Sequence, residues 1–285
     1  MGFSVSTEAR TSPNGATRAP LIKPIKNFRF EVAADTNVGL KRKINEDSIL
    51  GDDIEPVWLV ADGMGGHAAG DFASQTIVAA MQTLGVAASW EDLNHRFVHR
   101  LRHANTRIYH HAEEQGNGAI GSTIAALLAH EGRFVCCWSG DSRVYRLRGR
   151  HLRQITKDHT ELQALLDAGH ISLEDAENYP RKNVITQAIG VAEDADFDAV
   201  EGRLTDGDVF LICSDGLTEY FCDPEIEAIL NAHGRDLETA CETLIFQAVE
   251  RGGKDNVSVI VIRAYELSLP FAPIVDGYPE IEGAQ

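Results

Sequence analysis

The sequence has no long apolar run and no paired-cysteine motif. Its 285 residues include no stretch of 18 or more apolar residues, so we expect no membrane-spanning helix. The N-terminus has no apolar segment followed by a cleavage site, so we expect no secretory signal. The 5 cysteines form no C-x-x-C pair, and an odd number of thiols, mostly in apolar runs, favours a reducing compartment. We therefore expect a cytoplasmic protein.

Positive charge is also scarce. Against 43 Asp and Glu residues there are only 26 Lys and Arg, which gives a formal net charge of −17 at pH 7. A protein that binds nucleic acid or an anionic membrane needs a basic face, so we expect neither partner. Residues Met1–Ser6 do match the N-myristoylation pattern, but so short a match is weak evidence.

The chain divides into a central domain and two tails. Residues 1–27 contain three prolines among Ser, Thr, Asn and Gly without apolar periodicity, which predicts a flexible tail. Residues 266–285 are acidic and contain Pro and Gly, and we expect a second tail there. No linker or repeat interrupts residues 28–265, so they are predicted to form one domain.

Within this domain the apolar patterning predicts clusters of strands and pairs of helices. Clustered strands favour an α+β fold with antiparallel sheets rather than alternating βαβ units. The four strands expected between 122 and 155 resemble a meander because short turns join them. Strands are expected at about 28–34, 47–50, 56–61, 122–129, 133–139, 142–147, 150–155, 196–201, 207–213 and 256–264. Helices are expected at about 73–84, 91–114, 160–178, 223–231 and 236–251.

Four aspartates each lie at the edge of a short apolar run. Asp62, Asp141 and Asp215 follow such runs, and Asp255 precedes one. Because apolar runs of this kind are buried strands, their end residues can converge on one point. Unpaired carboxylates would then repel one another and shift their pKa values upward. Divalent cations relieve this repulsion, and oxygen ligands favour Mg²⁺ or Mn²⁺.

The glycine-rich turn after Asp62 allows two interpretations. Residues Gly63–Ala68 fit the G-x-G-x-x-A pattern of a dinucleotide-binding turn. Residues 72–90 contain no Asp or Glu to hold a ribose, and the strand order is not βαβ, so we disfavour an oxidoreductase. Alternatively, the glycines let the backbone approach a metal, with Asp62 shared by two cations and the Gly63 carbonyl as a further ligand.

Five short segments together resemble a known family. Their order and spacing closely resemble the metal-dependent Ser/Thr protein phosphatases, the PPM or type 2C family, in its bacterial form. The resemblance covers about residues 30–264 and implies an α-β-β-α sandwich of two mainly antiparallel sheets flanked by helix pairs. The segments are Arg42–Asp47, Ala61–His67, Gly140–Arg143, Cys213–Leu217 and Gly252–Asn256.

The resemblance also implies a set of metal ligands for two to three Mn²⁺ or Mg²⁺ ions. Asp62 corresponds to the ligand that bridges two ions, and Asp215 and Asp255 to ligands of the first ion. The Gly63 carbonyl corresponds to a ligand of the second ion, with Glu46 bound through water. A structural carboxylate is the alternative role for Glu46.

Four other positions have implied roles. Asp141 matches a third metal site of bacterial members, although Gly-Asp-Ser is also a turn signal. Arg42 matches the phosphate-binding arginine, although its neighbours Lys41 and Lys43 also fit a solvated basic face. Asp47 and Asn256 correspond to groups that orient ligands and waters.

The expected reaction is hydrolysis of phosphoserine and phosphothreonine on proteins. Two metals lower the pKa of a shared water to give hydroxide, and Arg42 binds phosphate oxygens. His67, at the start of a helix, is the candidate acid for the leaving oxygen, or else it only orders the glycine-rich turn. There is no Walker A motif, and the one Cys-x₅-Arg spacing, from Cys137 to Arg143, begins at a cysteine inside an apolar run, where an inert core thiol is expected rather than a nucleophile. A phosphoprotein-binding pseudophosphatase is the alternative, disfavoured because all the core aspartates are present.

The same resemblance suggests partners and marks one departure. We expect a monomer that acts on phosphorylated proteins, the products of a Ser/Thr kinase. Many bacterial members carry His before the proline that follows Tyr179, so substrate contacts around Tyr179–Asn183 are open. Segments Trp138–Tyr145 and Asn183–Thr186 also look similar to phosphatases linked to bacterial type VI secretion.

Overall fold

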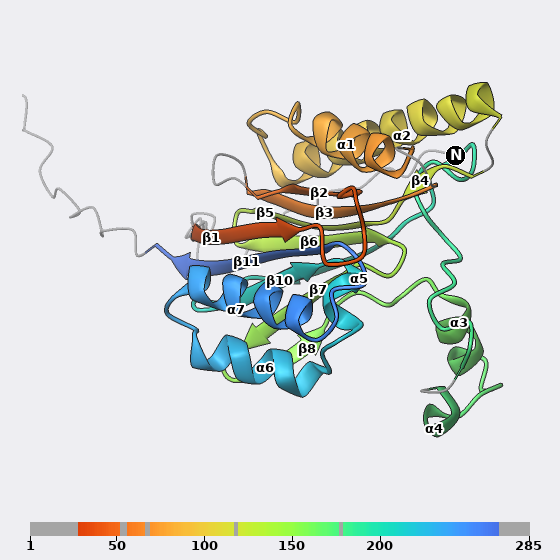
Figure 1. The fold of residues 1–285 in the computed structure, drawn as a ribbon. Coiled ribbons are helices and arrows are strands. Elements are labelled where there is room, and N and C mark those ends of the chain that lie inside the picture. The colour runs from red at the N-terminus through yellow and green to blue at the C-terminus, as the bar shows by residue number, and fades with distance from the viewer. Residues whose placement is uncertain (1–27, 52–55, 66–68, 117–118, 177–178, 268–285) are drawn as a thin grey trace, which may run out of the picture.

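Two antiparallel β-sheets pack face to face, and helices cover both outer faces (Figure 1). The computed structural model describes residues 28–51, 56–65, 69–116, 119–176 and 179–267. Helices α1 and α2 lie on one sheet, and α6 and α7 lie on the other (Figure 1). This arrangement confirms the predicted α-β-β-α sandwich. The predicted tails lie outside the described residues, apart from the last residues of the final strand.

The five-stranded sheet has the order β1-β11-β10-β7-β8. Its central strands β10 and β11 are buried on both faces, because one face meets the second sheet and the other meets α6 and α7. This explains why their sequences are almost continuously apolar. The strands are β1 (Phe28–Asn37), β7 (Arg143–Arg148), β8 (His151–Gln154), β10 (Val209–Cys213) and β11 (Val257–Glu266).

The second sheet has the order β2-β3-β5-β6-β9, with the short β4 paired to β3. Its inner face meets the first sheet in a shared core that includes the edge-to-face pair of Phe134 and Phe210, with ring centroids 5.1 Å apart. The strands are β2 (Asp47–Leu50), β3 (Val57–Met64), β4 (Gly121–Ser122), β5 (Ile124–His130), β6 (Arg133–Ser139) and β9 (Asp198–Arg203).

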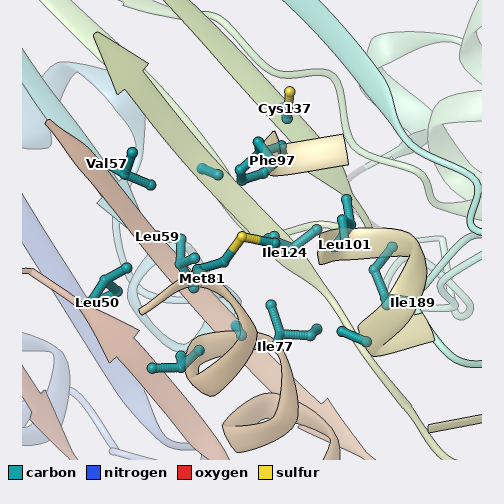
Figure 2. Packing of buried hydrophobic residues seen from close by; sticks show 14 of the residues in the cluster. Leu50, Val57, Leu59, Ile77, Met81, Phe97, Leu101, Ile124, Cys137 and Ile189 are labelled. Atoms are coloured by element: carbon teal, nitrogen blue, oxygen red, sulfur yellow. The ribbon is translucent and has the colours of Figure 1, made fainter. Parts of the chain in front are cut away.

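The long helices form two pairs. On the second sheet, α1 (Ala69–Met81) packs beside α2 (Trp90–Gln115), and on the first, α6 (Asp223–Ala232) packs beside α7 (Leu237–Glu250). Figure 2 shows Met81 of α1 between Leu59 of β3 and Ile124 of β5, and Ile77 of α1 belongs to the same outer core. Ala73, Ile77 and Met81, which recur at intervals of four along α1, are all buried. None of the helices in the described ranges is long and apolar enough to cross a membrane.

Two local predictions are wrong. The segments between 122 and 155 are not one meander, because β5 and β6 belong to one sheet while β7 and β8 belong to the other. The chain changes sheets at Gly140, whose φ of +105° permits a sharp redirection that turn composition alone does not reveal. The helix expected over 160–178 is instead two short helices, α3 (Glu161–Asp167) and α4 (Leu173–Ala176). Gly169, at φ +67°, ends the first of them.

Candidate metal centre

A cluster of acidic side chains forms where strands of both sheets end. Asp47 of β2 and Asp62 of β3 are opposite each other in the sheet register. Asp215 begins the short helix α5 (Asp215–Thr218) directly after β10, and Asp255 lies two residues before β11. Asp141 lies in the crossover between β6 and β7. The fold therefore brings together aspartates that are far apart in sequence.

Mutual repulsion shows how close these carboxylates are. Burial, followed by repulsion from Asp47, Asp215, Asp141 and Asp255, raises the pKa of Asp62 well above its ordinary value. Burial and then the charge of Asp215 raise the pKa of Asp141 to about 8. For Asp215 the pKa rises to about 6, through burial and then repulsion from Asp255. Without cations the cluster cannot hold all of its negative charge at neutral pH.

Among the residues that the structure describes, several buried oxygens of this cluster also have no hydrogen-bond donor. They are Glu46 Oε1, Asp47 Oδ1, Asp141 Oδ1 and Asp215 Oδ1. Buried carboxylate oxygens are normally paired, so four orphans in one place indicate a missing positive partner. Oxygen donors of this kind suit hard divalent cations such as Mg²⁺ and Mn²⁺. The residues present therefore fit a metal centre.

The oxygen ligands of the cluster are distributed over a wider area than a single ion would occupy. In the part of the chain that the structure describes, no group of three or more His, Cys, Asp or Glu side chains is arranged to hold an ion alone. Mg²⁺ is commonly held by one or two carboxylates and keeps several waters. The cluster thus fits a shared multi-ion site with water and backbone ligands, rather than a closed all-protein cage.

The Gly63 carbonyl and the Glu46 carboxylate lie beside the same glycine, Gly70. A Cβ atom on Gly70 would collide with Glu46 Oε1 and would lie 2.8 Å from the Gly63 carbonyl oxygen. The Gly63 N–H in turn donates to the Glu46 carbonyl at 3.1 Å. These contacts place one side-chain oxygen and one backbone oxygen together, as a second ion would need. Sequence analysis missed Gly70, because a glycine near a helix start carries no signal of its own.

Arg42 lies at the exposed side of the cluster. Its Nη2 donates to Asp255 Oδ2 at 2.7 Å, and its Nη1 lies 3.7 Å from Glu46 Oε2. The hydrogen bond to Asp255 raises the pKa of Arg42, so its charge is secure. The side chain is 48% exposed, which leaves part of the guanidinium open to an anionic ligand.

Comparisons with known proteins identify the family of this chain. The family model described as Stage II sporulation protein E (SpoIIE) matches residues 57–265. The chain is 35% identical to the serine/threonine phosphatase Stp of Listeria welshimeri over 235 residues, which covers 80% of this chain and 93% of that protein. The chain belongs to the PPM family of serine/threonine phosphatases.

Solved structures of PPM phosphatases share its architecture. The structure titled PppA, a key regulatory component of T6SS in Pseudomonas aeruginosa, matches with a TM-score of 0.77 and 36% identity, covering 84% of this chain and 100% of that one. The catalytic domain of the serine/threonine phosphatase PstP, in complex with two manganese ions, matches with a TM-score of 0.76 and 33% identity. That match covers 84% of this chain and 100% of the PstP domain.

In this PPM phosphatase, Asn256 holds the segment that carries Arg42 and Glu46. Its side-chain oxygen accepts from the Glu46 N–H at 2.8 Å. Its amide group donates to the carbonyls of Val38 at 3.0 Å and Ile44 at 3.1 Å. Because Asn256 is only 3% exposed, these bonds are shielded from water. The residue thus shapes the rim of the cluster without facing solvent.

Asp47 is held by two serines that sequence analysis did not single out. Ser214 Oγ donates to Asp47 Oδ2 at 2.8 Å, and Ser258 Oγ donates to the same oxygen at 2.6 Å. Burial still raises the pKa of Asp47 to about 7, although both hydroxyls lower it. The two donors occupy one oxygen and leave Oδ1 unpaired. Both serines adjoin recognised motifs, one residue before Asp215 and two after Asn256, so their positions offered the only sequence clue.

The remaining predicted site residue is His67. Residues 66–68 lie outside the described residues, and α1 begins immediately afterwards at Ala69. Its predicted role as an acid therefore stays a prediction.

A cavity of about 290 Å³ opens beside two of the aspartates. It lies between the cluster and the segment that carries α3, and Lys182 and Asn183 belong to its wall. In that segment, Glu161 accepts from Tyr179 and forms an ion pair with Arg181 at 2.6 Å. The cavity is lined by Asp141, Arg143, Asp158, Thr160, Leu162, Gln163, Leu166, Lys182, Asn183, Asp215, Thr218 and Glu219. A larger hollow of about 850 Å³ near the start of β1 contains none of the clustered aspartates.

Proposed function

We propose that this protein hydrolyses phosphoserine and phosphothreonine on proteins with the help of bound Mn²⁺ or Mg²⁺. The observation that carries the proposal is the group of four unpaired carboxylate oxygens buried beside Asp62, with Arg42 at its exposed side. Membership of the PPM family and the two manganese ions of the related PstP structure support it. An anionic phosphoester would meet a cation-loaded site and an arginine at one place.

The placement of the residues supports the ligand roles that the family resemblance implies. Asp62, which is repelled by every other aspartate of the cluster, would be shared by two ions. Asp215 and Asp255 would complete the first ion, and the Gly63 carbonyl would serve the second, with Glu46 bound through water. Asp141, whose strongest repulsive neighbour is Asp215, would share that residue in a third site. We therefore propose two to three ions.

The chemistry divides between the ions and the chain. Metal ions held by these residues would lower the pKa of a water, so that it could act as the nucleophile near neutral pH, and would offset negative charge on the phosphoryl group. Arg42 binds and orients the phosphate with its planar fork of donors. Asp47 offers its free oxygen as an acceptor for a water proton, and Asn256 keeps the segment bearing Arg42 in place. His67 would give a proton to the leaving serine or threonine oxygen.

The biological setting is also proposed. The substrates would be proteins phosphorylated by a Ser/Thr kinase, and the enzyme would act as a cytoplasmic monomer without nucleic-acid or membrane partners. Similarity to PppA supports, for this chain, a connection with type VI secretion. A pseudophosphatase scaffold would need at least one core aspartate to be missing, and all of them are present.

Phosphate release from a phosphothreonine peptide tests the proposal. The purified full chain should lose activity in excess EDTA and recover it when Mn²⁺ is added after the chelator is removed. A phosphotyrosine peptide of the same sequence serves as the control for substrate class. Full activity in the presence of the chelator would reject metal-assisted hydrolysis.

A further inference from the structure

Two hydrogen bonds join Gly140, the residue before Asp141, to His159. The Gly140 N–H donates to His159 Nδ1 at 3.2 Å. In return, the His159 backbone N–H donates to the Gly140 carbonyl at 2.9 Å. The histidine thus holds both backbone polar groups of this glycine, with its ring on one and its main chain on the other.

The ring of His159 is fixed from two further directions. It stacks on Trp138 with centroids 5.9 Å apart and an interplanar angle of 26°. Its Nε2 lies 3.3 Å from Asp198 Oδ2 of β9. A backbone N–H can only donate, so Nδ1 must be the unprotonated nitrogen and Nε2 carries the hydrogen that faces Asp198. The side chain is 11% exposed, so the ring is largely enclosed.

The Gly140 backbone needs such support, because its conformation is unusual. Its φ is +105°, and a Cβ at this position would lie 2.6 Å from the Thr123 side chain. At this residue the chain leaves one sheet for the other. The direction in which Asp141 leaves the turn therefore depends on how the Gly140 peptide groups are oriented.

A second contact ties the other side of Asp141 to the same segment. Arg143 donates from Nε to Asp158 Oδ1 at 2.9 Å and from Nη2 to Oδ2 at 2.6 Å. Asp141 is thus flanked by residues bound to the neighbours Asp158 and His159. Within the described part of the chain, Asp141 Oδ1 has no hydrogen-bond partner, so this carboxylate is positioned chiefly through the backbone.

We infer that His159 is a positioning residue, which orients Asp141 for metal binding by accepting the Gly140 N–H at Nδ1. The inference rests on the proposed role of Asp141 as a metal ligand. Outer partners of metal ligands are worth roughly 10–100-fold in metal affinity. Replacing His159 should therefore weaken the binding of the ion held by Asp141 and leave the binding of the ions held by Asp62 and Asp255 unchanged.

Two substitutions separate the acceptor from the packing of the ring. His159→Phe keeps an aromatic ring against Trp138 but removes Nδ1, whereas His159→Asn loses the stacking but can offer Oδ1 near the position of Nδ1. The exposed His151 of β8, changed to Phe, is a matched control. Amide hydrogen exchange of Gly140, measured in the metal-free full chain, reports directly on the hydrogen bond from the Gly140 N–H to His159 Nδ1. Titration with Mn²⁺, monitored by electron paramagnetic resonance, measures the number and affinity of the bound ions.

His159→Phe should speed Gly140 exchange about tenfold or more and weaken the Asp141-dependent ion by roughly 10–100-fold. His159→Asn and His151→Phe should both stay close to the wild type. Unchanged exchange and titration in His159→Phe would overturn the inference, and so would losses in His159→Asn as large as those in His159→Phe. Asp141→Asn distinguishes the two proposals. If it binds all ions normally, the ligand role fails and the inference with it; if it loses an ion that His159→Phe keeps, the inference alone fails.

Discussion

Arg42 forms an ion pair with Asp255 at 2.7 Å, although the two residues are 213 positions apart in sequence. Under the proposed function, one partner binds phosphate and the other binds metal. An ion at Asp255 would compete with the guanidinium and release it toward the substrate. The ion pair thus joins two groups to which the proposed function gives separate roles.

Arg42→Ala should raise KM for a phosphothreonine peptide by roughly tenfold or more, with a smaller fall in kcat, because phosphate binding is weakened before the chemical step. Arg42→Lys keeps the positive charge but loses the planar pair of N–H donors, so its KM should lie between those of the wild type and Arg42→Ala. Steady-state kinetics at saturating Mn²⁺ measure both constants. Unaltered KM and kcat in Arg42→Ala would remove the phosphate role.

His67→Gln should slow hydrolysis of a phosphothreonine peptide by roughly 10²–10⁴-fold, the usual range for a general acid. It should affect p-nitrophenyl phosphate far less, because nitrophenolate leaves without a proton. Both substrates are assayed at saturating metal. Equal losses on both would favour a residue that only orders the glycine-rich turn.

Asn256→Ala should destabilise the protein, because the Glu46 N–H and the Val38 and Ile44 carbonyls lose their buried partner. Each unsatisfied buried group costs about 1–3 kcal/mol, so Tm should fall by several degrees. Activity at temperatures well below Tm should also decrease, since the segment carrying Arg42 loosens. Calorimetry and KM together check this. A normal Tm would show that these bonds contribute little.

The metal-free protein should be more stable near pH 5 than near pH 8. The pKa values of Asp47, Asp141 and Asp215 rise from 3.8 to about 7, 8 and 6 in the folded protein. Groups with raised pKa values contribute stability below the unfolded value, and it is lost as pH rises through the folded values. Tm in EDTA should therefore fall between about pH 4 and pH 8, and Mn²⁺ should restore it at pH 8.

The matched control for this pH dependence is Asp141→Asn, which removes one titrating group. Its Tm in EDTA should vary less with pH than that of the wild type. A Tm in chelator that rises steadily up to pH 8 would contradict the repulsion in the cluster.

Strong periodicity and local motifs made much of the fold predictable. The apolar run before Asp215 and the one after Asp255 indicated buried strands, and β10 and β11 are there. The crossover at Gly140 was not predictable, because the choice of sheet depends on pairing with β9 or β10, which are distant in sequence. The break at Gly169 was missed because the surrounding residues favour helix on both sides.

Some residues of the candidate site could also be predicted from the sequence, and others could not. The aspartates could be found because each adjoins an apolar run, and this marks the end of a buried strand. Gly70, Ser214, Ser258 and His159 could not be singled out in that way, because their roles come from contacts across the sheets. Ser258, for instance, meets Asp47 from a position 211 residues away.

Under the proposed function, the aspartate cluster holds divalent cations through Asp62. Calorimetric titration of the metal-free full chain with Mn²⁺ tests it most directly, with Asp62→Asn as the partner variant and circular dichroism to show that both are folded. The wild type should bind at least two ions, and folded Asp62→Asn should lose high-affinity binding. Equal stoichiometry and affinity in the two proteins would contradict the account.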